Sequence, residues 1–243
     1  MPTSAESFAI PTQVRGIVFD AVGTILRPAP PFPVIYQQAA RRLGIELEQS
    51  AIFAKFVSAF GASDDYDRDV LHYRDSEQRE RDRWHAIVSS VFAEYLSGAA
   101  LETLFEELFS HYGQPANWQL FDDVPECWQN LRQRGFRVGV GSNYDSRLQS
   151  VVAGRPPLNE NDGLFISSLV GYRKPAREFY DAIAADWNLR PDELLMVGDD
   201  WLNDYQGARE AGWHAVFLDR GSKQPEQHGL RSLRELTHEN PTK

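Results

Sequence analysis

The sequence predicts an α/β fold in which a doubly wound parallel sheet carries an all-helical insertion after its first strand. A short β-branched and aromatic run at residues 14–19 is followed by about 80 residues whose apolar side chains recur at helical spacing. From residue 117 onward, short apolar runs alternate with helical stretches. Because parallel strands need helical crossovers to connect them, this alternation predicts a parallel, Rossmann-like sheet.

The predicted strands are short apolar runs bounded by turn residues. The first ends at residue 19 and is followed by a turn at residues 21–24. Later strands are predicted at residues 136–141, 164–166, 194–197 and 214–218, with helices at 124–134, 178–187 and 203–211. The proline cluster at residues 28–33 argues against a regular element there, because proline lacks a backbone donor.

The stretch between the first strand and residue 113 has a different hydrophobic pattern, with helical rather than strand periodicity. Amphipathic stripes, of which the clearest begins at Trp84, predict several helices that pack together. We expect Trp84 to belong to that packing. The highly charged stretch at residues 63–83 is expected to be an exposed connection or a solvated helix, with residues 68–83 as a solvated face.

These patterns divide the chain into parts. Residues 14–30 and 114–222 are expected to form the core, and residues 31–113 a helical cap inserted into it. Residues 1–13 and 223–243 are polar, and we expect them to be flexible tails.

The composition excludes several classes of partner. The 243 residues carry a formal net charge of −10, which repels a phosphate backbone and argues against nucleic-acid binding, although not against a small anionic substrate. No apolar run approaches the roughly 18–20 residues of a membrane span, so no membrane partner is expected. The single cysteine, Cys127, cannot form an intrachain disulfide, so we expect a reducing, cytoplasmic location. The oligomeric state is not determined by these observations.

Polar residues follow three of the predicted strands. They are Asp20, the pair at 142–143 (Ser142 and Asn143), and the pair at 199–200 (Asp199 and Asp200). Ligands of open α/β sheets bind at the carboxyl ends of the strands, so we expect these side chains to form the site. Clustered carboxylates repel each other, and a hard divalent cation such as Mg²⁺ relieves that repulsion. The alternative is that these residues are only helix N-caps.

Four ordered motifs resemble those of the haloacid dehalogenase (HAD) superfamily of hydrolases. They are Phe19-Asp20-Ala21-Val22-Gly23-Thr24, Ser142-Asn143, Lys174-Pro175 and Gly198-Asp199-Asp200-Trp201-Leu202-Asn203-Asp204. The resemblance covers residues 14–220 and includes a helical cap between the first and second motifs. Residues 142–148, 117–119 and 204–207 are most similar to the haloacid dehalogenase-like hydrolase domain-containing 3 group.

The resemblance implies a Mg²⁺-dependent phosphatase that acts on a small phosphorylated metabolite through an aspartyl-enzyme intermediate. The implied catalytic residues are Asp20 as the nucleophile, Ser142 as a donor to the transferred group, and Lys174 as the cation that steadies both. Asn143, Gly23 and Thr24 are the implied substrate-binding residues. The implied metal ligands are Asp20, the backbone carbonyl of Val22, and Asp199, with Asp204 or Asp200.

One position departs from the superfamily pattern. Its phosphatases usually carry a second aspartate two residues after the nucleophile as the general acid and base, whereas this chain has Val22. Such acid–base catalysis is worth on the order of 10²–10⁴ in rate. Two alternatives therefore stay open: a 2-haloacid dehalogenase-like hydrolase, whose halide leaves without a proton, and a catalytically weak member that binds a phosphorylated ligand or a protein.

Overall fold

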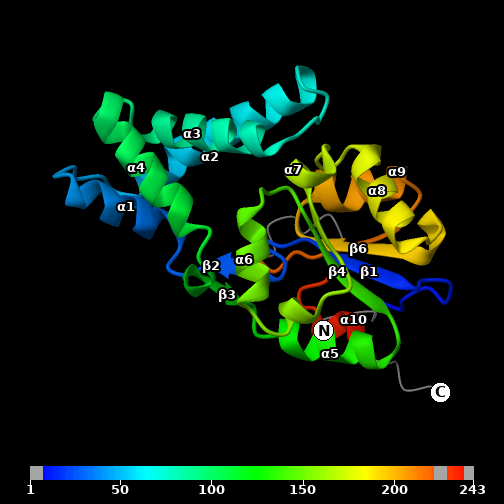
Figure 1. The fold of residues 1–243 in the computed structure, drawn as a ribbon. Coiled ribbons are helices and arrows are strands. Elements are labelled where there is room, and N and C mark those ends of the chain that lie inside the picture. The colour runs from blue at the N-terminus through cyan, green and yellow to red at the C-terminus, as the bar shows by residue number, and fades with distance from the viewer. Residues whose placement is uncertain (1–7, 222–228, 238–243) are drawn as a thin grey trace, which may run out of the picture.

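Five parallel strands form the sheet at the centre of the computed structural model, which describes residues 8–221 and 229–237 (Figure 1). In spatial order they are β5 (Leu164–Ile166), β4 (Arg137–Ser142), β1 (Gly16–Phe19), β6 (Leu194–Gly198) and β7 (His214–Phe217). All four pairings are parallel, which confirms the predicted fold class. Since β1 lies between β4 and β6, the carboxyl ends of these three strands are neighbours.

Helices cover both faces of the sheet, so its strands are buried on both sides. One face packs against α5 (Val124–Gln133), α6 (Arg147–Ala153) and α10 (Arg234–Thr237), and the other against α8 (Arg177–Trp187) and α9 (Gly207–Glu210). Side chains of successive β1 residues therefore pack on opposite faces of the sheet. Ile17 and Phe19 pack on the face covered by α5, α6 and α10, and Val18 packs on the face covered by α8 and α9. The shorter elements are α7 (Ser167–Val170), η1 (Pro115–Asn117), η2 (Leu158–Glu160), η3 (Pro191–Glu193) and η4 (Trp201–Gln206).

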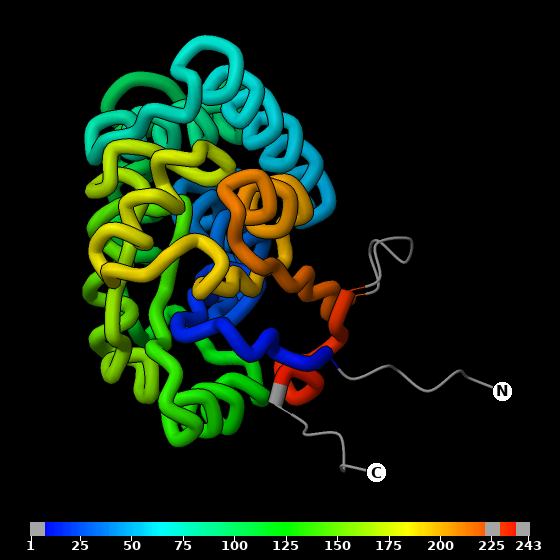
Figure 2. The backbone as a smooth tube through the Cα atoms, turned by 90° about the vertical axis from the view of Figure 1, so that its right-hand side faces the viewer, coloured from blue at the N-terminus to red at the C-terminus, as the bar shows by residue number. Residues whose placement is uncertain are grey.

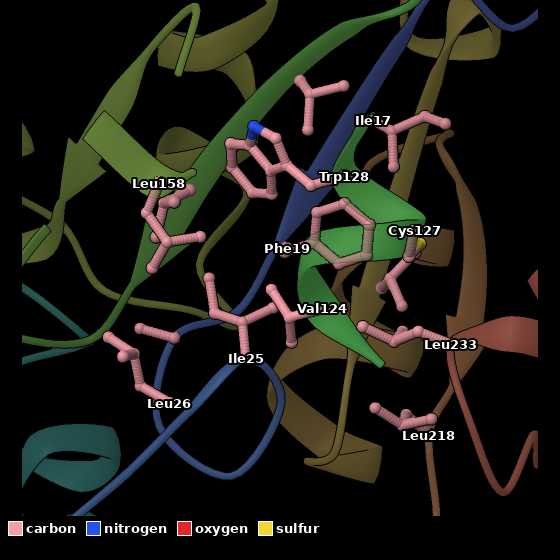
Figure 3. Packing of buried hydrophobic residues seen from close by; sticks show 14 of the residues in the cluster. Ile17, Phe19, Ile25, Leu26, Val124, Cys127, Trp128, Leu158, Leu218 and Leu233 are labelled. Carbon is pink, nitrogen blue, oxygen red and sulfur yellow. The ribbon is translucent and has the colours of Figure 1, made fainter. Parts of the chain in front are cut away.

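Large apolar side chains fill the layer beneath the first strand. Phe19 and Trp128 are each 1% exposed, and their ring centroids lie 5.8 Å apart. Figure 3 shows these rings with Ile25, Val124 and Leu233 packed around them. Burying each such side chain contributes about 1.5–3 kcal/mol, so this layer holds in place the end of β1 that precedes Asp20.

Four helices form a separate layer, which we call the insert. They are α1 (Phe32–Arg42), α2 (Gln49–Asp69), α3 (Glu77–Phe92) and α4 (Gly98–His111), and they share their own apolar cluster. Figure 1 shows the insert displaced to one side of the sheet, and Figure 2 shows its cyan helices, α2 and α3, at the opposite end of the molecule from the red α10. No helix among the described residues is long and apolar enough to cross a membrane.

The chain enters and leaves the insert through one small antiparallel ladder. β2 (Leu26–Pro28) pairs with β3 (Trp118–Leu120), with Pro28 opposite Trp118. The expectation that the proline cluster excludes regular structure was therefore wrong. Pro28 ends a strand, and Pro33 lies in the first turn of α1, the two kinds of position where a missing backbone donor costs little.

The charged stretch at residues 63–83 is only partly the exposed region that we expected, because some of its charged side chains are buried. Asp67, Glu80 and Arg83 are each only 1% exposed. They pair with one another and with Arg173 of the core, which offsets the cost of removing charges from water. Hydropathy alone hides such pairing, because each residue looks solvated by itself.

The predicted tails also differ from the structure where it describes them. Phe8 and Ile10 pack against the core, and Leu230, Leu233 and Leu236 are buried in it. The remaining parts of those stretches, together with residue 222, lie outside the described residues, which omit 1–7, 222–228 and 238–243. The predicted helix at 203–211 is a π-helical turn, η4, followed by the short α9.

Candidate active site

Three carboxylates meet at the carboxyl end of the central strands. Asp20 directly follows β1, Asp199 directly follows β6, and Asp204 lies on η4 just beyond. One oxygen from each lies within 4.8 Å of the others. This is the convergence that the strand-end pattern predicts, and oxygen donors so arranged suit a hard divalent cation.

The ammonium group of Lys174 lies among these carboxylates. Its Nζ donates to Oδ1 of Asp20 at 2.8 Å, to Oδ1 of Asp204 at 2.6 Å and to the carbonyl of Gly141 at 2.9 Å. All three ammonium protons therefore have partners. Burial alone would lower the pKa of Lys174, but the two carboxylates outweigh it and raise the pKa above its ordinary value, so the group stays charged.

One ammonium does not balance three carboxylates. Burial and the neighbouring charge of Asp20 raise the pKa of Asp199 to about 7. Burial also raises the pKa of Asp204 to about 8, even though Lys174 opposes that shift. The carboxyl groups of Asp199 and Asp204 thus hold their protons more tightly than usual, mainly because burial disfavours the charged forms and one ammonium group supplies too little positive charge. The residues present fit a Mg²⁺ ion, which would supply that charge through ligands of the type it prefers.

Gly23 and Thr24 shape the position of Asp199. Gly23 has φ +97°, a left-handed conformation that favours glycine, and a Cβ there would overlap the Asp199 carboxylate. The hydroxyl of buried Thr24 donates to Oδ1 of Asp199 at 2.9 Å. Both residues were predicted to bind substrate, and the structure places them against this carboxylate.

Ser142 is the last residue of β4, and Asn143 follows it and lies beside Lys174. Ser142 is 2% exposed and lines the cavity described below. The side-chain amide of Asn143 donates to the carbonyl of Lys174 at 2.9 Å and accepts from its backbone N–H at 2.8 Å. Asn143 therefore fixes the backbone that carries the buried lysine.

One predicted metal ligand, Asp200, lies apart from the acidic cluster. The exposed carboxylate of Asp200 accepts from the backbone and side chain of Asn203, which makes Asp200 the N-cap of η4. Its oxygens are not part of the cluster that Asp20, Asp199 and Asp204 form. Val22 is 38% exposed and its side chain lines the cavity.

A cavity of about 390 Å³ runs from the acidic cluster into the insert. Its core end is polar, with Asp20, Ser142 and Lys174 among the lining residues, whereas most of its remaining lining is apolar. Trp84, which we predicted to be only part of the packing, contacts Phe56 and Phe60 and also lines this cavity.

Sequence reasoning missed one buried ion cluster, which we call the Asp67 network. Asp67 of α2 accepts from Arg79 and Arg83 of α3 and from Arg173 of the core, and Arg173 lies 3.3 Å from Glu80. One feature of the sequence could have indicated this cluster: a second cation, Arg173, directly precedes Lys174 of the third motif. The Asp67 network therefore joins the insert to the loop that carries Lys174.

Comparison with known proteins agrees with the fold and the acidic site, which together indicate a hydrolase. The sequence model of the haloacid dehalogenase-like hydrolase family matches residues 14–212, and the chain belongs to that family. The chain is 29% identical over 238 residues to human haloacid dehalogenase-like hydrolase domain-containing protein 3, with 92% of each chain covered.

A relative with a named substrate and a solved structure extend the comparison. The chain is 28% identical over 147 residues to phosphoserine phosphatase from Thermus thermophilus, with 59% of each chain covered. It also resembles the crystal structure of a dehalogenase, with a TM-score of 0.71, 20% identity and coverage of 93% and 97%. At that identity the second likeness concerns the fold alone.

Proposed function

We propose that this hydrolase is a Mg²⁺-dependent phosphatase that acts on a small phosphorylated metabolite through an aspartyl-enzyme intermediate. The observation that carries the proposal is the unbalanced cluster of three carboxylates around Lys174. A phosphate ester brings further negative charge, so its binding requires a cation that the protein itself does not provide. The phosphoserine phosphatase relative supports the same reaction class.

In the proposed reaction Lys174 holds Oδ1 of Asp20, and Oδ2 attacks phosphorus. Ser142 would donate a hydrogen bond to the transferred phosphoryl group, and Lys174 would steady the charge that develops on it. Asp20, Asp199 and the carbonyl of Val22 would hold Mg²⁺, with Asp204 or Asp200 assisting. When bound, the ion would shield the carboxylate from the substrate anion and stabilise the transition state. The insert, residues 31–113 in the predicted division, would serve as the cap over this site.

Acetyl phosphate and p-nitrophenyl phosphate, each with Mg²⁺ and with EDTA, test this proposal. We expect turnover that requires Mg²⁺ and falls at least about 10³-fold in Asp20→Asn, because that change removes the nucleophile. Asp192→Asn, which alters an exposed aspartate paired with Arg190, is the matched control and should retain the activity of the unmodified protein. Equal rates in Asp20→Asn and the control would refute the proposal.

Val22 supports a second candidate, a 2-haloacid dehalogenase-like hydrolase, because a halide leaves without a proton. The acidic cluster argues against it, since buried carboxylates repel a carboxylate substrate. Chloride release from 2-chloropropionate in EDTA, lost in Asp20→Asn, would favour this second candidate. Absence of turnover with all three substrates would favour a binding role.

A further inference from the structure

We propose that the substrate has an uncharged aromatic body, which occupies the insert side of the cavity and departs as an aryloxide. This inference rests on the proposed phosphatase function and names its substrate class. It combines two independent observations: the chemistry of the cavity walls, and the side chain at position 22.

Aromatic side chains from all four insert helices line the cavity. Tyr36 comes from α1, Phe60 from α2, Trp84 from α3 and Phe109 from α4. The volume of about 390 Å³ is in the range of pockets that hold small organic molecules. Aromatic walls favour a flat aromatic occupant, since stacked and edge-to-face ring pairs add about 0.5–1.5 kcal/mol to simple burial, or roughly 2- to 10-fold in affinity.

The cations that line the cavity already have anionic partners. Arg83 and Arg173 both donate to Asp67, and Arg147 donates to Asp145 at 2.6 Å. Arg147 also lies over the ring of Phe109. None of these three guanidinium groups is left for a second anionic group on the substrate, so the cavity suits a body without charge. A substrate such as phosphoserine would bring an ammonium and a carboxylate into this apolar space at a high desolvation cost.

Three buried polar atoms on lining residues make no hydrogen bond within the described chain. Oε1 of Glu80 is one of them, and it lies 3.3 Å from the guanidinium group of Arg173. The other two, Nε1 of Trp84 and the hydroxyl of Tyr112, are donors, and leaving a buried donor unsatisfied is unfavourable. An aromatic body that carries an ether, carbonyl or hydroxyl oxygen would accept from these two donors.

Val22 sets the chemistry of the leaving group. Its side chain lines the cavity and cannot transfer a proton. In the proposed step Asp20 forms a bond to phosphorus while the phosphorus–oxygen bond to the leaving group breaks, and the oxygen keeps the bonding pair. An aryloxide tolerates that charge, and it takes its proton from water afterwards, whereas an alkoxide needs the missing acid. Water then hydrolyses the aspartyl phosphate to phosphate and free Asp20.

Binding of non-hydrolysable phosphonates tests the aromatic body. With Mg²⁺ present, calorimetry should show phenylphosphonate binding at least about 10-fold more tightly than methylphosphonate, and about 3-fold more tightly than cyclohexylphosphonate, which has the same size without the aromatic ring. Trp84→Ala should reduce the preference for phenylphosphonate about 3- to 10-fold. Tyr95→Ala, which removes an aromatic side chain that is 45% exposed on the same helical layer, is the control and should leave the preference intact.

Kinetics test the leaving group. Phenyl phosphate should be hydrolysed at least about 100-fold faster than cyclohexyl phosphate by the unmodified protein. Val22→Asp should narrow that ratio at least about 10-fold, because a supplied acid helps the poorer leaving group more. This inference would be overturned if Val22→Asp left the ratio of the phenyl phosphate rate to the cyclohexyl phosphate rate unchanged, or if the three phosphonates bound equally well. The proposed function would still stand in either case, provided that the protein hydrolyses acetyl phosphate. If the unmodified protein did not hydrolyse acetyl phosphate, or if Asp20→Asn hydrolysed it equally well, the proposed function itself would be overturned.

Discussion

The protein buries two groups of charged side chains that are built on opposite principles. In the Asp67 network, carboxylates and guanidinium groups face each other directly, so that Asp67 alone has three arginine partners. In the acidic cluster, three carboxylates share the single ammonium of Lys174. The first group balances its own charge, whereas the second requires a cation from outside the chain.

The two groups differ in their roles: the Asp67 network attaches the insert to the core, whereas the acidic cluster forms the candidate active site. A balanced network holds the insert against the core loop and has no capacity left for a ligand, because its charges are already partnered. An unbalanced cluster is costly in the free protein, as the raised pKa values of Asp199 and Asp204 show, and that cost is relieved when a ligand binds. The balance of charge, rather than the pKa of any one acid, therefore distinguishes the acidic cluster from the Asp67 network, since burial also raises the pKa of Glu80 in that network.

Removing the cation of the acidic cluster should have the largest effect on stability. Lys174→Met leaves three neighbouring carboxylates, two of them buried, without a positive charge, and we expect it to lower the free energy of unfolding in EDTA by about 3–5 kcal/mol. Chemical denaturation measures this change. The matched control is Lys55→Met, since the Lys55–Glu94 pair lies at the surface and should contribute less than about 1 kcal/mol. Equal losses in the two variants would contradict the assigned role of Lys174.

Breaking the balanced network should be somewhat less costly. Asp67→Asn keeps the shape of the side chain but removes the charge that Arg79, Arg83 and Arg173 share, and we expect a loss of about 3 kcal/mol by the same denaturation measurement. Asp65→Asn, which alters an exposed aspartate of the same helix, should change stability by less than about 0.5 kcal/mol. If Asp67→Asn matched this control, the network would not attach the insert.

The smallest predicted effect depends on pH and concerns the acid at the edge of the network. Burial raises the pKa of Glu80 to about 7, although Arg173 opposes the shift. The folded state therefore holds the proton of the Glu80 carboxyl group more tightly than the unfolded chain does. The stability that this tighter binding contributes is complete below about pH 4.5 and is lost as the pH rises through about 7. Glu80→Gln should consequently gain stability relative to the unmodified protein between pH 5 and pH 8, by at most about 3 kcal/mol.

Denaturation at several pH values, with the exposed Glu46→Gln as control, checks this prediction. The control should give a difference that does not change with pH. A constant difference for Glu80→Gln as well would mean that Glu80 does not bind its proton more tightly in the folded protein.

Much of the core could be predicted because local pattern and packing agree there. Short apolar runs ending in Asp20, Ser142 and Asp199 predict both the strands and the meeting of their carboxyl ends, and the structure brings these residues together. The helix at α5 likewise ends where Gly135, with φ +83°, breaks it. In each case one local signal determines the element.

The parts that could not be predicted depend on partners far away in the sequence. Asp67 and Arg173 are 106 residues apart, and neither shows from its neighbours that the other will balance its charge. Leu230, Leu233 and Leu236 lie in a polar stretch whose burial depends on the layer formed by α5. The role of Asn143 depends on the loop of Lys174, 31 residues further along the chain. Such relations exist only once the chain has folded.

The short ladder of β2 and β3 has a consequence for how new specificities arise. Pro28 and Trp118 are directly paired, and adjacent strands lie only about 4.8 Å apart, so a tight turn is long enough to replace the whole insert between them. Exchange of the insert at this point would change the apolar walls of the cavity, but a new insert would also have to replace Asp67 and Glu80 as the partners of Arg173. The ladder therefore offers a junction for exchange, whereas the Asp67 network limits which inserts the core can accept.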